Sequence, residues 1–187
     1  SWARLAIFLG DERCVPPESD ESNLRMLRTA LAEARDKLPP RSIRPMWAPE
    51  DPRAPATEAE RERAARGYET QLPRQLDVLL LGMGADGHVA SLFPGSPALA
   101  ETARRVVPSR APVPPHERLT ITPPAIAAAR RVLVLVSGPD KAEAVAAVLG
   151  EPGSAALPPA ALARHGTWLL DRAAGARLGP SCAGGAT

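Results

Sequence analysis

A glycine-rich turn followed by a histidine is the part of this sequence best suited to chemistry. Residues 79–95 read LLLGMGADGHVASLFPG, an apolar run with three glycines and then His88. A histidine in the first turn of a helix lies at the positive end of the macrodipole, which disfavours the imidazolium form. We therefore predict that a helix begins here and that a neutral His88 acts as a general base, with a structural histidine as the alternative. Asp86 is placed to orient either the imidazole ring or the attacking water.

The same glycines also match the Gly-x-Gly-x-x-Gly fingerprint of dinucleotide-binding loops. That fingerprint requires a long helix after the third glycine and an acidic residue about 20 positions further on. Here Pro94 and Gly95 would end a helix within two turns, and residues 106–107 are both valine. We therefore predict that no nicotinamide cofactor binds. The remaining interpretations are a catalytic or anion-binding turn, or glycines that only make a tight connection from strand to helix.

Two more charged segments follow apolar runs and are candidates for anion binding. In Gly10-Asp11-Glu12-Arg13, the guanidinium of Arg13 can meet an anionic or developing negative charge while the acids position it. The alternative is a surface loop whose charges pair internally. Lys141 stands in the first turn of a predicted helix, where a cation opposes the macrodipole. That unfavourable placement points to a phosphate on the exposed amides, with the ammonium group as its counter-charge.

These residues need a scaffold, and the chain alternates predicted strands with predicted helices. Such alternation is typical of an α/β fold with a doubly wound, mainly parallel sheet and helices on both faces. Because ligands of such sheets bind at the carboxyl ends of the strands, we expect the loops 10–13, 82–88 and 138–141 to form one site. Strands are predicted at 5–9, 43–48, 78–81, 119–122, 131–136 and 167–170. Helices are predicted at 24–34 with Asp20 or Ser22 as cap, 57–72 with a Thr57–Glu60 capping box, 140–149, 160–164 and 171–178.

Length and charge exclude several classes of protein. A chain of 187 residues suffices for one domain, which we place at 1–178 with a flexible tail at 179–187. With 23 basic and 21 acidic residues the net charge is +2, so no global field draws nucleic acid or a membrane surface. No apolar run approaches the ~20 residues that span a bilayer. Cys14 and Cys182 are predicted to be reduced thiols of a cytoplasmic protein.

Four motifs occur in order along the chain. They are FLGDER at 8–13 with SN at 22–23, LGMGADGHVASLFPG at 81–95, PHERLTIT at 115–122 and GPDKA at 138–142. Together they resemble the 6-phosphogluconolactonases, in the superfamily of glucosamine/galactosamine-6-phosphate isomerases. The resemblance spans roughly residues 5–178, and the motif with His88 is its most specific part.

This resemblance implies hydrolysis of 6-phosphoglucono-δ-lactone to 6-phosphogluconate in the oxidative pentose phosphate pathway. The reaction would use general-base activation of water, with no metal, nucleotide or other cofactor. A functional association with glucose-6-phosphate dehydrogenase is a further expectation. The carbonyl oxygen needs a hydrogen-bond donor, for which loop amides or Arg13 are candidates. The implied catalytic residues are His88, Asp86 and Arg13, and the implied substrate-binding residues are Asp11, Asn23, Arg118 and Lys141.

The chain departs from this family at its start. Members normally begin with a further strand–helix unit that carries a Gly-Gly-Ser-Thr-Pro-like phosphate loop, and no such loop follows Ser1. We therefore expect the sheet to lack that N-terminal unit and the phosphate site to be incomplete.

Two other functions fit part of the pattern. Sugar-phosphate deaminases and isomerases resemble the chain in the Gly-x-Gly-x-Asp-Gly-His turn and in the later lysine. They are expected to have Asn-Glu-Pro where this sequence has Leu92-Phe93-Pro94. The second alternative is a fragment that binds sugar phosphate without turnover. An assay of lactone hydrolysis, followed as acid release, separates the three functions.

Overall fold

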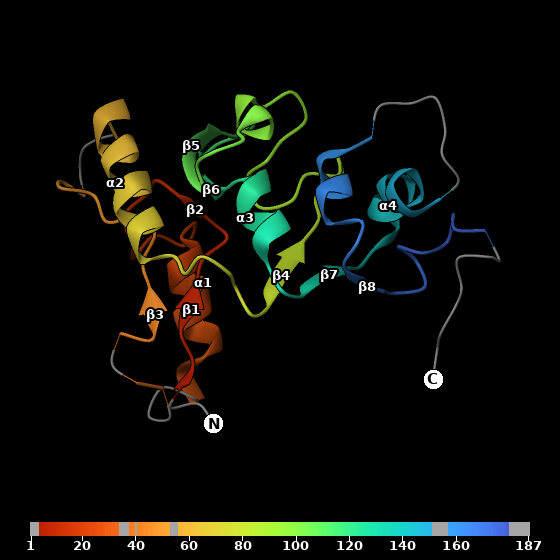
Figure 1. Cartoon of the computed structure of the whole chain (residues 1–187), viewed down its shortest axis with the longest axis horizontal. Helices are drawn as coiled ribbons and strands as arrows, with labels where there is room; N and C mark the ends of the chain where they lie inside the picture. The colour runs from red at the N-terminus through yellow and green to blue at the C-terminus, as the bar shows by residue number, and fades with distance from the viewer. Residues whose placement is uncertain (1–3, 34–37, 40, 53–55, 151–156, 180–187) are drawn as a thin grey trace.

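Three small sheets form the scaffold of the part of the chain that the structure describes (Figure 1). The computed structural model describes residues 4–33, 38–39, 41–52, 56–150 and 157–179. One sheet pairs β1 (Ile7–Phe8) with β3 (Ile43–Arg44) in parallel. A second parallel sheet has the order β4 (Leu79–Gly82), β7 (Val132–Val136), β8 (Thr167–Leu170). The predicted α/β class with mainly parallel pairing is confirmed.

The third sheet is antiparallel and was not predicted as such. Its order is β2 (Asp11–Arg13), β6 (Glu117–Ile121), β5 (Val106–Arg110). The prediction of a charged loop at residues 10–13 is therefore wrong for Asp11–Arg13, because these residues pair with β6. Strand β5 was not predicted from the sequence, because Pro108 lies inside it. A proline is tolerated there since β5 is an edge strand and needs no donor on its free side.

The alternation of buried and exposed side chains along β7 shows which face of the second parallel sheet packs on the core. Valines 132, 134 and 136 of β7 are buried, while the intervening Leu135 is half-exposed. Successive side chains of a strand point to opposite faces, so the described residues cover mainly one face of this sheet. Its other face presents Leu80, Leu135 and Leu169.

Local capping signals determine where the two longer predicted helices begin. The Ser22 side chain accepts a hydrogen bond from the Arg25 amide at the start of α1 (Asn23–Ala30). The predicted capping box of Thr57 and Glu60 is present at the start of α2 (Glu58–Gln71) and is confirmed. In the middle of the chain, α3 (Pro123–Ala128) escaped prediction because it is short and begins with two prolines.

The later helices are shorter than predicted. Residues 140–149 divide into a 3-10 turn, η4 (Pro139–Lys141), and α4 (Ala142–Leu149). The helix predicted at 160–164 is a 3-10 helix, η5 (Pro159–Ala163), and a further 3-10 turn, η3, spans Pro97–Ala100.

The closing helix predicted at 171–178 is wrong. The chain there makes successive turns. Asp171 caps the first of them by accepting from the Ala174 amide and also accepts from the Gly138 amide, while Gly175 weakens the helix propensity of the segment. None of the described helices is long and apolar enough to cross a membrane. Of the predicted tail, residues 180–187 lie outside the described part of the chain, as does Cys182.

Candidate active site

His88 lies in a hydrogen-bonded turn after β4. The Gly87 amide donates to the carbonyl of Gly84, and the Gly84 amide donates to the carbonyl of His88 at 2.9 Å. Gly87 and Ala90 both have positive φ, of 77° and 49°, which prevents a right-handed helix from starting here. The prediction of a helix beginning at His88 is therefore wrong, and the argument from the helix macrodipole does not apply to this residue.

The orientation of the His88 ring comes from Asp86 instead. His88 Nδ1 lies 2.6 Å from Asp86 Oδ1, and the His88 amide donates to the same oxygen at 3.1 Å. Because an ionised carboxylate only accepts, Nδ1 is the ring nitrogen that donates to Asp86, and Nε2 is the nitrogen that faces away from this contact. The ring also packs on Phe93, with centroids 4.5 Å apart. Of the two roles open to Asp86, the geometry supports orientation of the ring.

Asp86 remains ionised despite its partial burial. Burial raises the pKa of this carboxyl, but the hydrogen bonds from the His88 amide and ring lower it by more. The pKa of Asp86 therefore falls below its ordinary value. The acceptor that holds the imidazole tautomer is therefore charged throughout the neutral range.

Gly84 provides the space that the His88 ring occupies. A Cβ at this position would lie 2.2 Å from both Cε1 and Nδ1 of His88 and 2.8 Å from Asp86 Oδ1. Gly87 is confined in the same way, since a Cβ there would lie 2.4 Å from Pro158 Cβ and would meet Ala144 of α4 at 3.5 Å. The glycines of the motif thus allow close approach to the His88 ring and to Pro158, which precedes η5.

One face of the antiparallel sheet presents two guanidinium groups side by side. Arg13 of β2 stands directly opposite Arg118 of β6, and side chains opposite each other share a face. Arg118 is only 6% exposed and its Nε is buried without a hydrogen bond. Within the described residues, no hydrogen bond or ion pair engages its guanidinium. Burial and the neighbouring charge of Arg13 lower the pKa of Arg118.

The two arginines are suited to an anionic ligand. Arg13 is held by the carbonyl of Glu21, which accepts from its Nη1 at 2.5 Å, and by the more distant Glu21 carboxylate. No comparable partner serves Arg118 among the residues the structure describes. Two adjacent cations, one of them desolvated, suit a phosphate or carboxylate because guanidinium groups bind such oxyanions bidentately.

Asp11 and Asn23 lie beside the two arginines and contact each other. Asn23 Nδ2 donates to the Asp11 carbonyl at 2.9 Å and to Asp11 Oδ1 at 3.2 Å. Asp11 Oδ2 accepts from the Ser91 hydroxyl at 2.6 Å. Ser91 follows His88 by three residues, so this contact joins the loop 82–88 to the strand at residues 11–13.

The role of Glu12 as a helix cap was not predicted from the sequence. Its buried carboxylate accepts from the amides of Asn23 and Leu24, each at 2.8 Å, and from the Ser22 hydroxyl. It thereby caps α1 and holds Asn23 beside β2. Strand alternation would have indicated it, because in a strand at 11–13 Glu12 points away from Asp11 and Arg13.

The loop at residues 138–141 was the third one predicted to join the site, and in the described part of the chain it makes no hydrogen bond to the other two. Lys141 ends η4, and its Nζ lies 2.5 Å from Asp140 Oδ2; this hydrogen bond lowers the pKa of Asp140. In the described part of the chain, Lys141 makes no hydrogen bond or ion pair with the other predicted site residues. The closest link is the packing of Gly87 on Ala144, one turn along α4 from Lys141.

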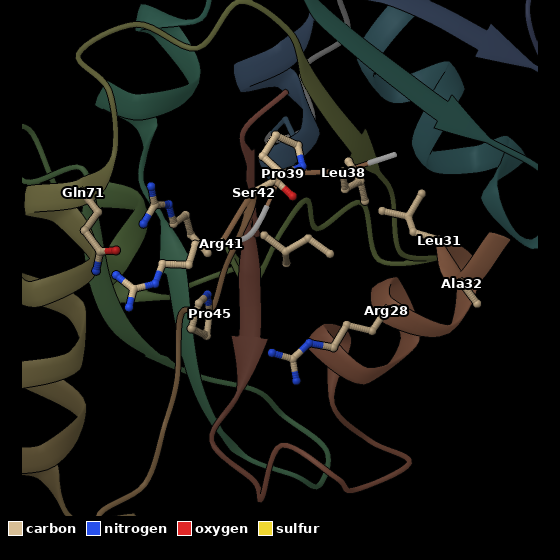
Figure 2. Close-up of a pocket in the computed structure, with 11 residues that line it drawn as sticks. Arg28, Leu31, Ala32, Leu38, Pro39, Arg41, Ser42, Pro45 and Gln71 are labelled. Carbon is tan, nitrogen blue, oxygen red and sulfur yellow. The ribbon is translucent and has the colours of Figure 1, made fainter. Parts of the chain in front are cut away.

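Two cavities differ in their relation to these residues. A groove of about 1200 Å³ borders Asp86 and Phe93 and extends to His116. Figure 2 shows a different cavity, of about 890 Å³, between Arg28 of α1 and Gln71 at the end of α2. None of the predicted site residues lines it. Among the described residues, no group of three or more His, Cys, Asp or Glu is arranged to hold a metal ion.

Comparisons with known proteins agree with the motifs. The sequence profile described as "Glucosamine-6-phosphate isomerases/6-phosphogluconolactonase" matches residues 1–170. The 6-phosphogluconolactonase of Mycobacterium tuberculosis is 44% identical over 185 residues, which cover 95% of this chain and 74% of that protein. The human GDH/6PGL endoplasmic bifunctional protein is 38% identical over 147 residues, 76% of this chain and 18% of its own length. The structure of 6-phosphogluconolactonase from Trypanosoma brucei superposes with a TM-score of 0.80 at 34% identity, covering 92% of this chain and 73% of that one.

Proposed function

Because the chain belongs to the family of glucosamine-6-phosphate isomerases and 6-phosphogluconolactonases, we propose that it hydrolyses 6-phosphoglucono-δ-lactone to 6-phosphogluconate. This reaction is a step of the oxidative pentose phosphate pathway. The observation that carries the proposal is the imidazole of His88, held by Asp86 with Nε2 free, on a loop that also contacts the strand of Arg13. A base and an anion-binding pair on joined segments suit a phosphorylated lactone.

In the proposed mechanism, His88 Nε2 removes a proton from water as the water attacks the lactone carbonyl. Asp86 holds the ring and stabilises the imidazolium that forms. The carbonyl oxygen becomes an oxyanion, for which amides of the glycine turn are the candidate donors because Arg13 is assigned to the phosphate. The intermediate then collapses as the bond from the carbonyl carbon to the ring oxygen breaks. The imidazolium returns its proton to that ring oxygen.

The phosphate is proposed to bind to Arg13, Arg118 and Lys141. Arg118 has the strongest support, because its charge is desolvated and unpaired within the described residues. Direct substrate contacts for Asp11 and Asn23 stay predictions, since these side chains already bind Ser91 and each other.

A direct assay tests the proposed function. Freshly prepared 6-phosphoglucono-δ-lactone is added to the protein and acid release is followed at constant pH, with spontaneous hydrolysis subtracted. Release of ammonia from glucosamine 6-phosphate is measured in parallel. Acid release well above the spontaneous rate supports the lactonase, whereas ammonia release alone would favour a deaminase. Binding of 6-phosphogluconate with neither reaction would leave a non-catalytic binding protein.

Gly84→Ala is expected to lower kcat for the lactone by about 10–100-fold, because the added methyl displaces the His88 ring from Asp86. The matched control is Gly82→Ala, where a Cβ meets no atom within 4 Å. Steady-state kinetics and thermal unfolding of both variants check this result. Equal loss of activity in the two variants would contradict the role assigned to Gly84.

Lys141→Ala is expected to raise KM for the phosphorylated lactone about tenfold or more, with little change in kcat. A phosphate remote from the carbonyl is held similarly in the ground and transition states, so its loss weakens binding uniformly. Activity on unphosphorylated δ-gluconolactone should barely change. If both substrates suffer equally, Lys141 is structural.

A functional association with glucose-6-phosphate dehydrogenase is proposed as well. It is supported by the human relative whose name joins GDH with 6PGL in one bifunctional protein. A cytoplasmic location is proposed as well, because Cys14 is a free thiol, as is usual in a reducing compartment.

A further inference from the structure

Ser91 is a buried polar residue that the lactonase mechanism does not use. It is 1% exposed, and each of its polar groups binds a different strand of the antiparallel sheet. Its hydroxyl donates to Asp11 Oδ2 of β2 at 2.6 Å, and its amide donates to Thr120 Oγ1 of β6 at 3.1 Å. Its carbonyl accepts from the Ser109 hydroxyl of β5 at 2.7 Å. We call these three hydrogen bonds the Ser91 junction.

The register of the sheet explains why three strands reach one residue. Asp11 stands opposite Thr120, and Thr120 stands opposite Val107, two residues from Ser109. Alternation places Asp11, Thr120 and Ser109 on the face that also carries Arg13 and Arg118. Ser91 therefore sits on the same polar face as the two guanidinium groups.

The Ser91 junction connects the segment that carries His88 with the sheet that carries Arg13 and Arg118. His88 follows β4 of the parallel sheet, whereas Arg13 and Arg118 belong to the antiparallel sheet, and no ladder between the described strands connects the two. In Figure 1 the strands β2, β5 and β6 lie to the left of β4, β7 and β8. The distance between the base and the arginines therefore depends on side-chain contacts.

The backbone beside Ser91 is strained. Ala90 has a φ of 49°, a left-handed conformation that a residue with a Cβ rarely adopts and that persists only when its surroundings enforce it. The Ser91 junction on one side and the turn from Gly84 to His88 on the other enforce it here.

Ser91 is not placed to be a nucleophile, although a serine near a histidine invites that interpretation. Its hydroxyl is buried and donates its hydrogen bond to Asp11. Among the described residues, no hydrogen bond links this hydroxyl to His88. A group that reaches neither substrate nor base can act only through its neighbours.

We propose that Ser91, with Asp11 and Asn23 behind it, is a positioning residue that sets the separation between His88 and the Arg13–Arg118 pair. The inference rests on the proposed lactonase function, in which one substrate must engage both halves of the site. Asn23 completes the arrangement, because its amide holds the Asp11 carboxylate that receives the Ser91 hydroxyl.

The test compares two substrates in Ser91→Ala. A phosphorylated lactone must reach His88 and the arginines together, whereas unphosphorylated δ-gluconolactone needs only His88. We expect kcat/KM to fall about tenfold or more for the phosphorylated lactone and less than about twofold for the unphosphorylated one. Ser42→Ala is the matched control, since Ser42 is also buried but lines the cavity that none of the predicted site residues border. Loss on both substrates alike, or on neither, would overturn the proposal.

A double-mutant cycle with Asp11→Asn tests whether Ser91 acts through Asp11. The two effects on the phosphorylated lactone should be far from additive if they pass through one hydrogen bond. Ser91→Thr, which keeps the hydroxyl, is expected to recover at least part of the activity. Additive effects would show that the two residues act separately.

A binding measurement distinguishes failure of this inference from failure of the proposed function. Titration with 6-phosphogluconate should shift the His88 ring resonances of the unmodified protein, and Ser91→Ala should reduce that shift while calorimetry shows similar affinity. If the unmodified protein binds 6-phosphogluconate but does not hydrolyse the lactone, the proposed function fails and this readout still decides the role of Ser91. An unchanged shift in Ser91→Ala overturns the inference alone.

Discussion

Replacing His88 by alanine is expected to lower kcat for 6-phosphoglucono-δ-lactone by about 10²–10⁴ with a smaller effect on KM. A general base acts on the proton of water in the transition state and contributes little to binding of the ground state. The expectation rests on Nε2, which the hydrogen bond of Nδ1 to Asp86 leaves as the basic nitrogen. Initial rates at saturating substrate, corrected for spontaneous hydrolysis, provide the measurement.

The control for this variant is His165→Ala. His165 is exposed and lies outside the candidate site, so its replacement should change kcat by less than about twofold. Retention of more than half of the original kcat by His88→Ala would remove His88 from the mechanism. Thermal unfolding of both variants verifies that neither effect comes from loss of the fold.

Arg118→Met is expected to raise KM for the phosphorylated lactone by about 10–100-fold without lowering the stability of the free protein. Burial lowers the pKa of Arg118, which means that the folded state disfavours the charged guanidinium. Because the guanidinium is charged at neutral pH, its burial lowers the stability of the folded protein there. Methionine fills a similar volume without a charge, so the melting temperature should stay constant or rise. Binding and stability thus change in different directions, which a residue with a structural role would not show.

Arg104→Met serves as the contrast, because Arg104 is another poorly exposed arginine but binds both carboxylate oxygens of Glu62, at 2.9 and 3.0 Å. Removing one member of that pair should lower the melting temperature and leave KM unchanged. A lower melting temperature for Arg118→Met, with KM unaltered, would assign Arg118 to the fold instead of to the substrate.

Much of the scaffold follows from local sequence. Thr57 and Glu60 form their capping box because the bonds involved lie within one helical turn. The strands β4, β7 and β8 fall where apolar runs predict them, since a continuous apolar run is stable only as a buried strand or helix. The motif around His88 likewise identifies the family, because its glycines and its histidine are close neighbours in the chain.

The surroundings of His88 were decided by tertiary structure. Local pattern predicts a helix after the third glycine, whereas the chain makes a turn because Ser91 is drawn onto the antiparallel sheet and Ala90 adopts a left-handed conformation. The partner in that contact, Asp11, is 80 residues away in the sequence. No periodicity within a window of a dozen residues reports a bond between such distant positions.

Long-range pairing also explains why the proximity of Arg13 and Arg118 could not be predicted from the sequence, whereas the caps of the two helices could. Arg13 and Arg118 become neighbours only through the register of β2 against β6, a pairing of segments about a hundred residues apart. The sequence by itself determined the residue types of the candidate site and those elements whose signals are local, such as α2, β4, β7 and β8. Tertiary pairing decided that Arg13 lies opposite Arg118 and that the segment after His88 contacts the strand of Arg13 through Ser91, because only the folded chain brings these distant segments and their hydrogen bonds together.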